Sequence, residues 1–241
     1  MWFHHNFFPY VLYDDSLYGY YKKESRMIYY LMGKSASGKD SIFHKLLERT
    51  GWKQLIPYTT RPMREGEIEG QEYHFITKEE FLNYIASGEM AEYRAYDTVF
   101  GKWYYGTILP EERRKSGADS AGTKNHEKGT EAEEDLTDTA SMLAIGTLES
   151  YLQLKKKLGK ENIIPIYIEV PTELRLKRAL LREEGKGKMT EEEIQRRFKA
   201  DDEDFSEEKL QEAEIEKRYR NIELSACVEE ILGDLRECLI P

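Results

Sequence analysis

Residues 33–41 read Gly33-Lys34-Ser35-Ala36-Ser37-Gly38-Lys39-Asp40-Ser41. An apolar run, 27–32, comes before them and predicts a strand, and the amphipathic run 42–49 after them predicts a helix. Two glycines separated by four residues, with a lysine after the second, have the spacing of a phosphate-binding loop. Glycines let successive N–H groups turn into one concavity, and the following helix adds the positive end of its dipole. The stretch therefore predicts a strand–loop–helix unit that binds phosphates.

Lys39 is the mobile cation that such a loop directs at the β- and γ-phosphates of ATP. The predicted ATP-binding residues are Gly33, Ser35, Ala36, Ser37, Gly38, Lys39, Asp40 and Ser41. One position departs from the motif, because Asp40 stands where Ser or Thr normally helps to hold Mg²⁺. Either Ser41 or the Asp40 carboxylate can take that role. A glycine- and serine-rich turn with an exposed lysine is the alternative interpretation.

Composition limits the possible classes of protein. The 241 residues suit one domain with appendages, and 39% hydrophobic residues are enough for a core. A net charge of −10 argues against non-specific binding of nucleic acid, which needs a basic face. Cys227 and Cys238 fit reduced thiols, and no run approaches the roughly 18 apolar residues of a membrane span. We expect a cytoplasmic protein with neither nucleic-acid nor membrane partners.

Strand-like and helical runs alternate along the rest of the chain. The near-continuous apolar run 163–170 is typical of a parallel strand covered on both faces. The alternation predicts an α/β fold in which helices flank a parallel sheet. The expected strands are 27–32, 53–57, 74–77, 91–96, 103–107, 141–146 and 163–170, and the expected helices are 40–49, 78–87, 150–158 and 171–181.

Two segments fall outside this pattern. Residues 1–26 are rich in aromatic side chains without a clear period, and we expect an N-terminal extension that is disordered or an assigned start upstream of the true one at Met27. Residues 111–138 contain almost no large apolar side chain and predict a disordered insertion. The main domain is then 27–241. The acidic run 200–205 predicts a solvated helix start rather than a metal site.

A polar arm follows the second expected strand. It contains paired threonines, Thr59 and Thr60, and two arginines three residues apart, Arg61 and Arg64. Two guanidinium groups at this spacing can clamp one phosphate through charge-assisted bonds, and Tyr73 can add a hydroxyl donor. The alternative is that both arginines merely solvate a loop among the nearby glutamates.

This arm and the loop together resemble the guanylate kinases, a family of P-loop nucleoside monophosphate kinases. The arm matches the pattern T-T-R-x-x-R-x-G-E-x-x-G-x-x-Y-x-F, and the likeness extends over about 27–107 and 141–235. The resemblance implies a P-loop NTPase-type parallel sheet, a small nucleoside monophosphate (NMP)-binding β arm at about 58–107 and a short helical lid at about 178–197. ATP is the implied co-substrate, and Mg²⁺ is the implied cofactor.

The resemblance also assigns residues to the acceptor nucleotide. Arg61, Arg64, Tyr73 and Tyr105 match contacts to its phosphate, and Thr107 falls where the family has a serine near the base. Glu92 matches the carboxylate that accepts hydrogen bonds from guanine N1 and N2. A solvated charge on an edge strand is the alternative for Glu92.

Arginines also mark the expected lid. Arg175, Arg178 and Arg182 share one face of a helix at positions i, i+3 and i+7, and Arg196-Arg197 follow. The resemblance implies that Arg178, Arg182 and Arg197 approach the ATP phosphates, where guanidinium groups stabilise the charge of the transferring phosphoryl group. Together with Lys39 and Arg61 they are the candidate catalytic residues. The alternative is that these arginines pair with nearby glutamates.

Two departures concern base recognition. The family usually has a serine that reads guanine O6 two residues before the paired threonines, and this chain has Pro57 there. The family's Asp-x-Asp after the third strand corresponds here to Ala144-Ile145-Gly146, with Glu149 close by as a possible substitute. Transfer to GMP or dGMP is the expected reaction. A kinase for another monophosphate and a non-catalytic guanylate-kinase-like binding module are the alternatives.

Overall fold

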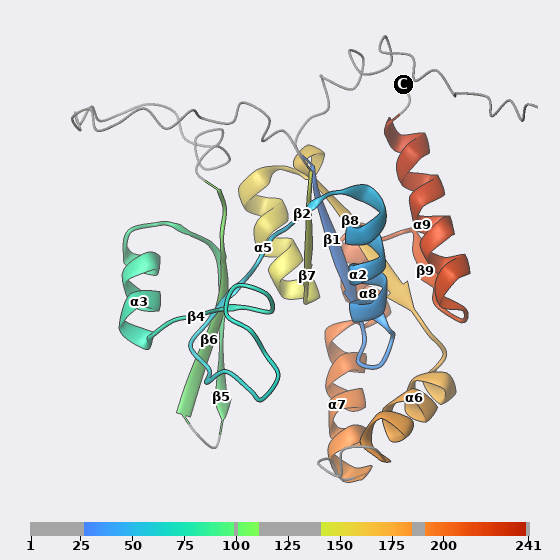
Figure 1. Cartoon of the computed structure of the whole chain (residues 1–241), viewed down its shortest axis with the longest axis horizontal. Coiled ribbons are helices and arrows are strands. Elements are labelled where there is room, and N and C mark those ends of the chain that lie inside the picture. The colour runs from blue at the N-terminus through green and yellow to red at the C-terminus, as the bar shows by residue number, and fades with distance from the viewer. Residues whose placement is uncertain (1–26, 99–100, 111–140, 185–190, 240–241) are drawn as a thin grey trace, which may run out of the picture.

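The computed structural model describes residues 27–98, 101–110, 141–184 and 191–239 (Figure 1). The N-terminal extension 1–26 and the insertion 111–138 lie outside the described residues, as does the segment 185–190 in the middle of the expected lid.

The larger sheet has five strands, all of them parallel, in the order β2-β7-β1-β8-β9. Its central strand β1 is buried on both faces along its whole length, as its apolar sequence predicts. The predicted strand 53–57 forms a β-strand over only two residues, Lys53–Gln54. The Leu55 N–H nevertheless donates to the Leu143 carbonyl at 2.9 Å. The bounds are β1 (Ile28–Gly33), β2 (Lys53–Gln54), β7 (Met142–Gly146), β8 (Ile163–Glu169) and β9 (Arg218–Arg220).

Helices cover both faces of this sheet (Figure 1). On one face, Tyr29 and Leu31 of β1 pack with α2 (Lys39–Thr50) and α9 (Leu224–Leu239). On the other face, Ile28 and Tyr30 pack with α5 (Leu148–Leu158) and the region of α8 (Glu207–Glu212). The alternation of β1 side chains between the two cores follows from the period of two along a strand. The predicted α/β architecture is confirmed.

The polar arm forms a second sheet in the order β4-β3-β6-β5, to one side of the first (Figure 1). Helix α3 (Lys78–Ala86) packs on it through the buried Phe81. The helix begins where Thr77 accepts the Glu80 N–H and the Glu80 carboxylate accepts the Thr77 N–H, a capping box. The strands are β3 (Tyr58–Thr59), β4 (His74–Phe75), β5 (Met90–Thr98) and β6 (Gly101–Ile108), which confirms the predicted strand pair.

The remaining helices follow β8 at the carboxyl end of the large sheet. Helix α6 (Thr172–Glu184) and helix α7 (Glu191–Asp204) flank the segment that lies outside the described residues, and a short 3-10 turn, Lys160–Asn162, precedes β8. The carboxyl ends of β1, β7 and β8 meet at one edge, which is where α/β sheets bind ligands. Within the described ranges, none of the helices has the length and apolar character needed to cross a membrane.

Candidate nucleotide site

The loop between β1 and α2 has the backbone of a phosphate-binding loop. Gly38 adopts a left-handed conformation with φ 81°, and Ala36 does the same with φ 59°. Gly38 is the N-cap of α2, and no side chain among the described residues caps this helix start. The first N–H groups of α2 therefore have no side-chain partner at the N-cap, and the positive end of the helix dipole faces the loop. Asp40 and Ser41, the two predicted Mg²⁺ ligands, are exposed in the first turn.

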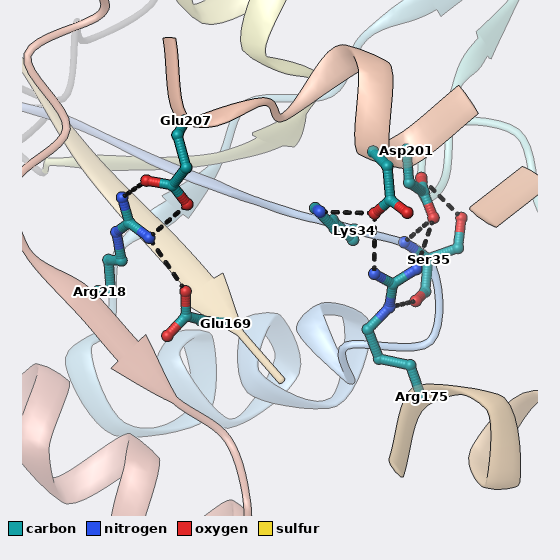
Figure 2. Close-up of polar contacts among 8 residues, drawn as sticks. Lys34, Ser35, Glu169, Arg175, Asp201, Glu207 and Arg218 are labelled. Atoms are coloured by element: carbon teal, nitrogen blue, oxygen red, sulfur yellow. Dashed lines mark hydrogen bonds and ion pairs between the residues drawn. The ribbon is translucent and has the colours of Figure 1, made fainter. Parts of the chain in front are cut away.

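A buried ion pair anchors the loop to the two helices beyond β8 (Figure 2). Asp201 accepts the Ser35 N–H at 2.8 Å and the Ser35 hydroxyl at 3.0 Å. Arg175, which is only 2% exposed, donates from Nε to the Ser35 carbonyl at 3.0 Å and from Nη2 to Asp201 at 3.2 Å. Lys34 forms a second ion pair with Asp202 at 2.6 Å. Two consecutive residues of α7, Asp201 and Asp202, and Arg175 of α6 thus fix the first half of the loop. The Arg175 guanidinium also stacks on Phe198 of α7.

This anchor corrects the prediction for the acidic run 200–205. The run lies at the carboxyl end of α7 rather than at a helix start, because the helix begins at Glu191. Asp201 faces the loop instead of solvent, with a side chain 15% exposed. Within the described residues no group of three or more acidic, histidine or cysteine side chains could hold a metal ion.

Asn221 closes the other half of the loop. Its side-chain Nδ2 donates to the Ser37 carbonyl at 2.8 Å, and both residues are buried. A Cβ atom added to Gly38 would lie 2.5 Å from this Nδ2, so the absence of a side chain at Gly38 is what allows the contact. Arg178 donates from Nη2 to the Asn221 carbonyl at 3.0 Å, which places its guanidinium next to the loop.

The other predicted lid arginines are not at the loop. Arg182 is exposed at the end of α6. Arg197 donates from Nε to Glu193 at 3.0 Å and is 48% exposed, and Arg196 binds the same carboxylate at 2.7 Å. The pairing with a nearby glutamate is the alternative that the sequence left open for these arginines. Arg175, on the same helix as Arg182, is buried under the loop and was not predicted to anchor it.

A cavity of about 260 Å³ lies between the end of the large sheet and the arm. It brings together four predicted acceptor residues and the positions that depart from the family pattern. Arg61 and Arg64 are not among the lining residues, and Glu149 lines a different cavity. The cavity is lined by Tyr30, Leu55, Pro57, Tyr73, Glu92, Arg94, Tyr96, Tyr105, Thr107, Ala144, Ile145, Gly146 and Thr147.

Glu92 is buried in this cavity and is 2% exposed, so it is not a solvated charge on the edge of a sheet. Thr107, its direct partner across β5 and β6, donates to Oε1 at 2.7 Å. Oε2 has no hydrogen-bond partner among the residues that the structure describes, and Arg94 Nε lies 3.7 Å from it. Burial raises the pKa of Glu92, while the Arg94 charge and the hydrogen bonds from Thr107 and Ser150 oppose that rise. Glu92 therefore presents an acceptor that a ligand can satisfy.

Arg61 is buried beside the cavity rather than solvated in a loop. Its two terminal nitrogens bind Glu67 in a bidentate pair, with Nη1 at 2.6 Å, and its guanidinium lies 4.9 Å from the centre of the Tyr73 ring. The hydrogen bond and charge of Arg61 lower the pKa of Glu67. Arg64 is exposed, and its N–H donates to the same Glu67 carboxylate at 2.7 Å. Glu67 thus organises the turn that carries both predicted phosphate ligands.

Arg94 and Tyr30 are two of the cavity residues that the sequence analysis did not single out. Arg94 follows Glu92 by two positions on β5, so both point to the same face, and this period was the available signal. Tyr30 lies on β1 and its hydroxyl occupies the space beside Gly146, where an added Cβ atom would overlap it. A carboxylate at position 146 has no room beside Tyr30, which explains why this chain carries glycine there. Burial raises the pKa of Tyr30 far above its ordinary value.

A phosphate loop after the central strand of a parallel sheet, beside a small sheet with a carboxylate-lined cavity, defines a P-loop protein of the NTPase fold. The sequence model of the family "Guanylate kinase" matches residues 25–230. This match spans most of the chain, and the chain belongs to the guanylate kinase family.

Individual relatives agree with this assignment. A guanylate kinase of Vibrio parahaemolyticus is 41% identical over 97 residues, which cover 38% of this chain and less than half, 45%, of that protein. A guanylate kinase of Fusobacterium nucleatum is 28% identical over 208 residues, covering 86% of this chain and 92% of that protein. Among solved structures, guanylate kinase from Anaplasma phagocytophilum has a TM-score of 0.58 at 22% identity, covering 91% of this chain and 89% of that one. This structural likeness supports the fold.

Proposed function

We propose that this protein transfers the γ-phosphoryl group of ATP to GMP or dGMP and releases two nucleoside diphosphates. The observation that carries the proposal is Glu92, a buried carboxylate whose Oε2 has no partner among the described residues. Guanine presents two donors, N1–H and N2–H, on one edge, and a carboxylate accepts both. Adenine presents its acceptor N1 at that position and is disfavoured there. Family membership supports the same reaction.

Each nucleotide has its own set of residues in this proposal. The loop N–H groups and Lys39 hold the ATP phosphates at the start of α2. Tyr73 and Tyr105, whose rings lie 5.8 Å apart on the cavity wall, bind the acceptor phosphate together with Arg61 and Arg64. Arg61 is paired with Glu67 in this structure, so engaging a phosphate requires it to share or exchange that partner.

Mg²⁺ fits this site as a companion of ATP. Mg²⁺ keeps several waters and is held by substrate phosphates with one or two protein oxygens. The exposed Asp40 carboxylate and Ser41 hydroxyl at the start of α2 supply such oxygens. The ion, when bound, neutralises charge that develops on the phosphates.

The protein's own residues act by positioning and by electrostatics, without a covalent intermediate. Lys39 and Arg178 place positive charge beside the loop, and the tyrosines and arginines of the arm hold the attacking phosphate oxygen in line. Closure of the predicted lid over Arg178 and Arg182 excludes water that would otherwise hydrolyse ATP. Retention of Gly38 and Lys39 argues against a non-catalytic binding module.

A coupled ADP-release assay with ATP, Mg²⁺ and each nucleoside monophosphate tests the proposal. We expect a strong preference for GMP or dGMP over AMP, CMP and UMP. Turnover with another monophosphate in preference to GMP would retain the kinase and reject the assignment of Glu92 to guanine. Absence of turnover with all of them, alongside measurable ATP binding, would favour the binding module.

A further inference from the structure

The cavity that holds Glu92 contains few charged side chains. Among the described residues that line it, Arg94 is the one cation and Glu92 the one carboxylate. Pro57, Ala144 and Gly146 form part of the wall and bring no side-chain hydrogen-bond donor. The Thr107 hydroxyl is already used, because it donates to Glu92. A ligand acceptor atom close to Glu92 therefore needs a donor other than Thr107, and the lining offers the hydroxyls of the tyrosines and Thr147 and the guanidinium of Arg94.

Arg94 is placed to be that donor. Its side chain is 10% exposed, and Nη1 donates to the Thr147 hydroxyl, which fixes one end of the guanidinium. Its Nε has no hydrogen-bond partner among the described residues and lies 3.7 Å from Glu92 Oε2, beyond hydrogen-bond distance. Arginine carries five N–H donors in a rigid fork. A buried guanidinium with an unused donor is costly unless a ligand completes it.

The Glu92–Arg94 pair has the polarity of one particular base edge. Guanine has donors at N1 and N2 next to acceptors at O6 and N7. An arginine fork matches O6 and N7, and a carboxylate matches the neighbouring donors. Adenine would direct its 6-amino donor at the guanidinium, and two donors facing each other are repulsive. Glu92 Oε2 and Arg94 Nε lie 3.7 Å apart, and neither has a hydrogen-bond partner among the described residues. The two groups together thus fit the edge of a 6-oxopurine.

We propose that Arg94 is a specificity-determining residue that donates hydrogen bonds to the 6-oxo edge of the guanine base. Arg94 thereby supplies the donor that Pro57 cannot offer. This inference rests on the proposed function, because it names a second contact to the same acceptor base. A purely structural Arg94 would instead neutralise Glu92 and brace Thr147 without touching the base.

The test compares GMP with 2-aminopurine riboside 5′-monophosphate, which keeps N2 but lacks the 6-oxo group and the N1 proton. The lost N1 contact to Glu92 affects wild type and Arg94 variants alike, so the change in preference between them reports on Arg94. Wild-type protein is expected to prefer GMP in kcat/KM, and Arg94→Met is expected to reduce that preference by about 10- to 100-fold, the value of one bidentate base contact. Arg94→Lys keeps a cation next to Glu92 but loses the fork, so we expect an intermediate preference. Lys102→Met, an exposed cation of the neighbouring strand that pairs with Asp97, is the matched control.

A loss of activity that is equal for both nucleotides in the Arg94 variants would overturn the proposal and leave Arg94 a structural residue. The same ratio is measured as dissociation constants, from the fluorescence of the 2-aminopurine nucleotide and its displacement by GMP. If the wild type shows no turnover of GMP, the proposed function fails, while the binding ratio still decides the role of Arg94. Failure of GMP to bind the wild type would reject both. Thermal unfolding identifies a variant that does not fold, and Arg94→Lys then carries the test.

Discussion

Arg175 Nη2 and Asp201 Oδ2 lie 3.2 Å apart, and each side chain also hydrogen-bonds to Ser35 in the phosphate loop. Arg175 belongs to α6 and Asp201 to α7, so one buried pair joins the loop to both helices that border the expected lid (Figure 2). Rearrangement of α6 or α7 must therefore act on the loop. The anchor therefore couples the predicted ATP-binding loop to α6 and α7.

Removing Asp201 should destabilise the protein and weaken ATP binding. Asp201→Ala leaves the buried Arg175 with only the more distant Asp202 carboxylate, 3.9 Å from Nη1, and we expect a loss that approaches the cost of a broken buried pair, about 3–5 kcal/mol of unfolding free energy. The same change frees the Ser35 N–H and hydroxyl, and we expect a higher KM for ATP. Urea unfolding and the coupled assay measure the two effects.

Asp202→Ala is the matched control for that experiment. Its carboxylate is the next one along α7, is 56% exposed, pairs with Lys34 at 2.6 Å and lies 3.9 Å from Arg175 Nη1, so it is the more distant of the two acidic partners of Arg175. Exposed pairs contribute about 0–1 kcal/mol. Equal destabilisation by the two variants would contradict the special role given to the buried pair.

Gly38→Ala should damage the ATP site beyond its backbone cost. The new Cβ would lie 2.5 Å from Asn221 Nδ2, which must then release the Ser37 carbonyl. Gly51→Ala provides the control, because Gly51 has a similar φ of 68° but nothing within 4 Å of an added Cβ. Both variants should lose about 1–2 kcal/mol from left-handed strain. Only Gly38→Ala should also raise the KM for ATP, and comparable ATP kinetics in the two variants would reject the contact's role.

Lys39→Ala should abolish turnover without unfolding the protein. The lysine lies at the first position of α2, where its charge meets the ATP phosphates in the proposed site, and we expect kcat/KM to fall at least ~10²-fold. Lys45→Ala removes an exposed lysine of the same helix that pairs with Glu48, and it should retain activity. Circular dichroism checks the fold of both. Substantial activity in Lys39→Ala would refute the assignment of the loop.

Gly146→Ala should destabilise the protein because the added methyl group overlaps the Tyr30 hydroxyl. Overpacking of this kind costs about 1–3 kcal/mol, and a second change, Tyr30→Phe, should restore part of it. Gly233→Ala, within α9 and with nothing near an added Cβ, should instead stabilise by about 0.5–1 kcal/mol. Chemical denaturation measures the free energy of unfolding of the wild type, of Gly146→Ala with and without Tyr30→Phe, and of Gly233→Ala. A neutral Gly146→Ala would show that Tyr30 adapts without cost.

Much of this fold was readable from local patterns. The apolar run at β1 with the glycine loop and helix α2 after it predicted the strand–loop–helix unit, since strand and helix periods are local properties. The spacing of apolar residues and the glycine after it also predicted the helix over 78–87. In the structure this helix ends at Ala86, one residue earlier. Glu92, Tyr73, Tyr105 and Thr107 were all predicted to meet one nucleotide, and the structure places them around one cavity.

The features that were missed depend on contacts between distant segments. Asp201 and Ser35 are 166 residues apart, and nothing in the run 200–205 indicates that one carboxylate faces inward. Tyr30 belongs to an apolar strand, so its hydroxyl at position 146 emerges only from the register of β1 against β7. Helical spacing grouped Arg175 with Arg178 and Arg182, and it could not indicate that Asp201 of α7 holds Arg175 under the loop.

The kcat/KM for GMP should rise with pH on the acidic side of its pH profile, the acid limb, as Glu92 ionises. Burial raises the pKa of this carboxyl, so the folded protein retains a proton at pH values where an ordinary glutamate has lost it. Guanine N1 and N2 need the ionised form, and activity should therefore rise with pH through the raised pKa. The same shift means that stability falls with rising pH between the ordinary and the raised pKa, because the folded state there binds more protons than the unfolded state.

Glu92→Gln isolates this limb. The phosphate of GMP also titrates, with a second pKa of about 6, but this titration affects the wild type and the variant equally. The difference between the two pH profiles of kcat/KM at saturating ATP therefore belongs to Glu92. Arg94→Met should move the limb to higher pH, since the Arg94 charge opposes the rise in the pKa of Glu92. A limb that persists in Glu92→Gln, or one at the pH of an exposed glutamate, would show that the buried carboxylate does not read the base.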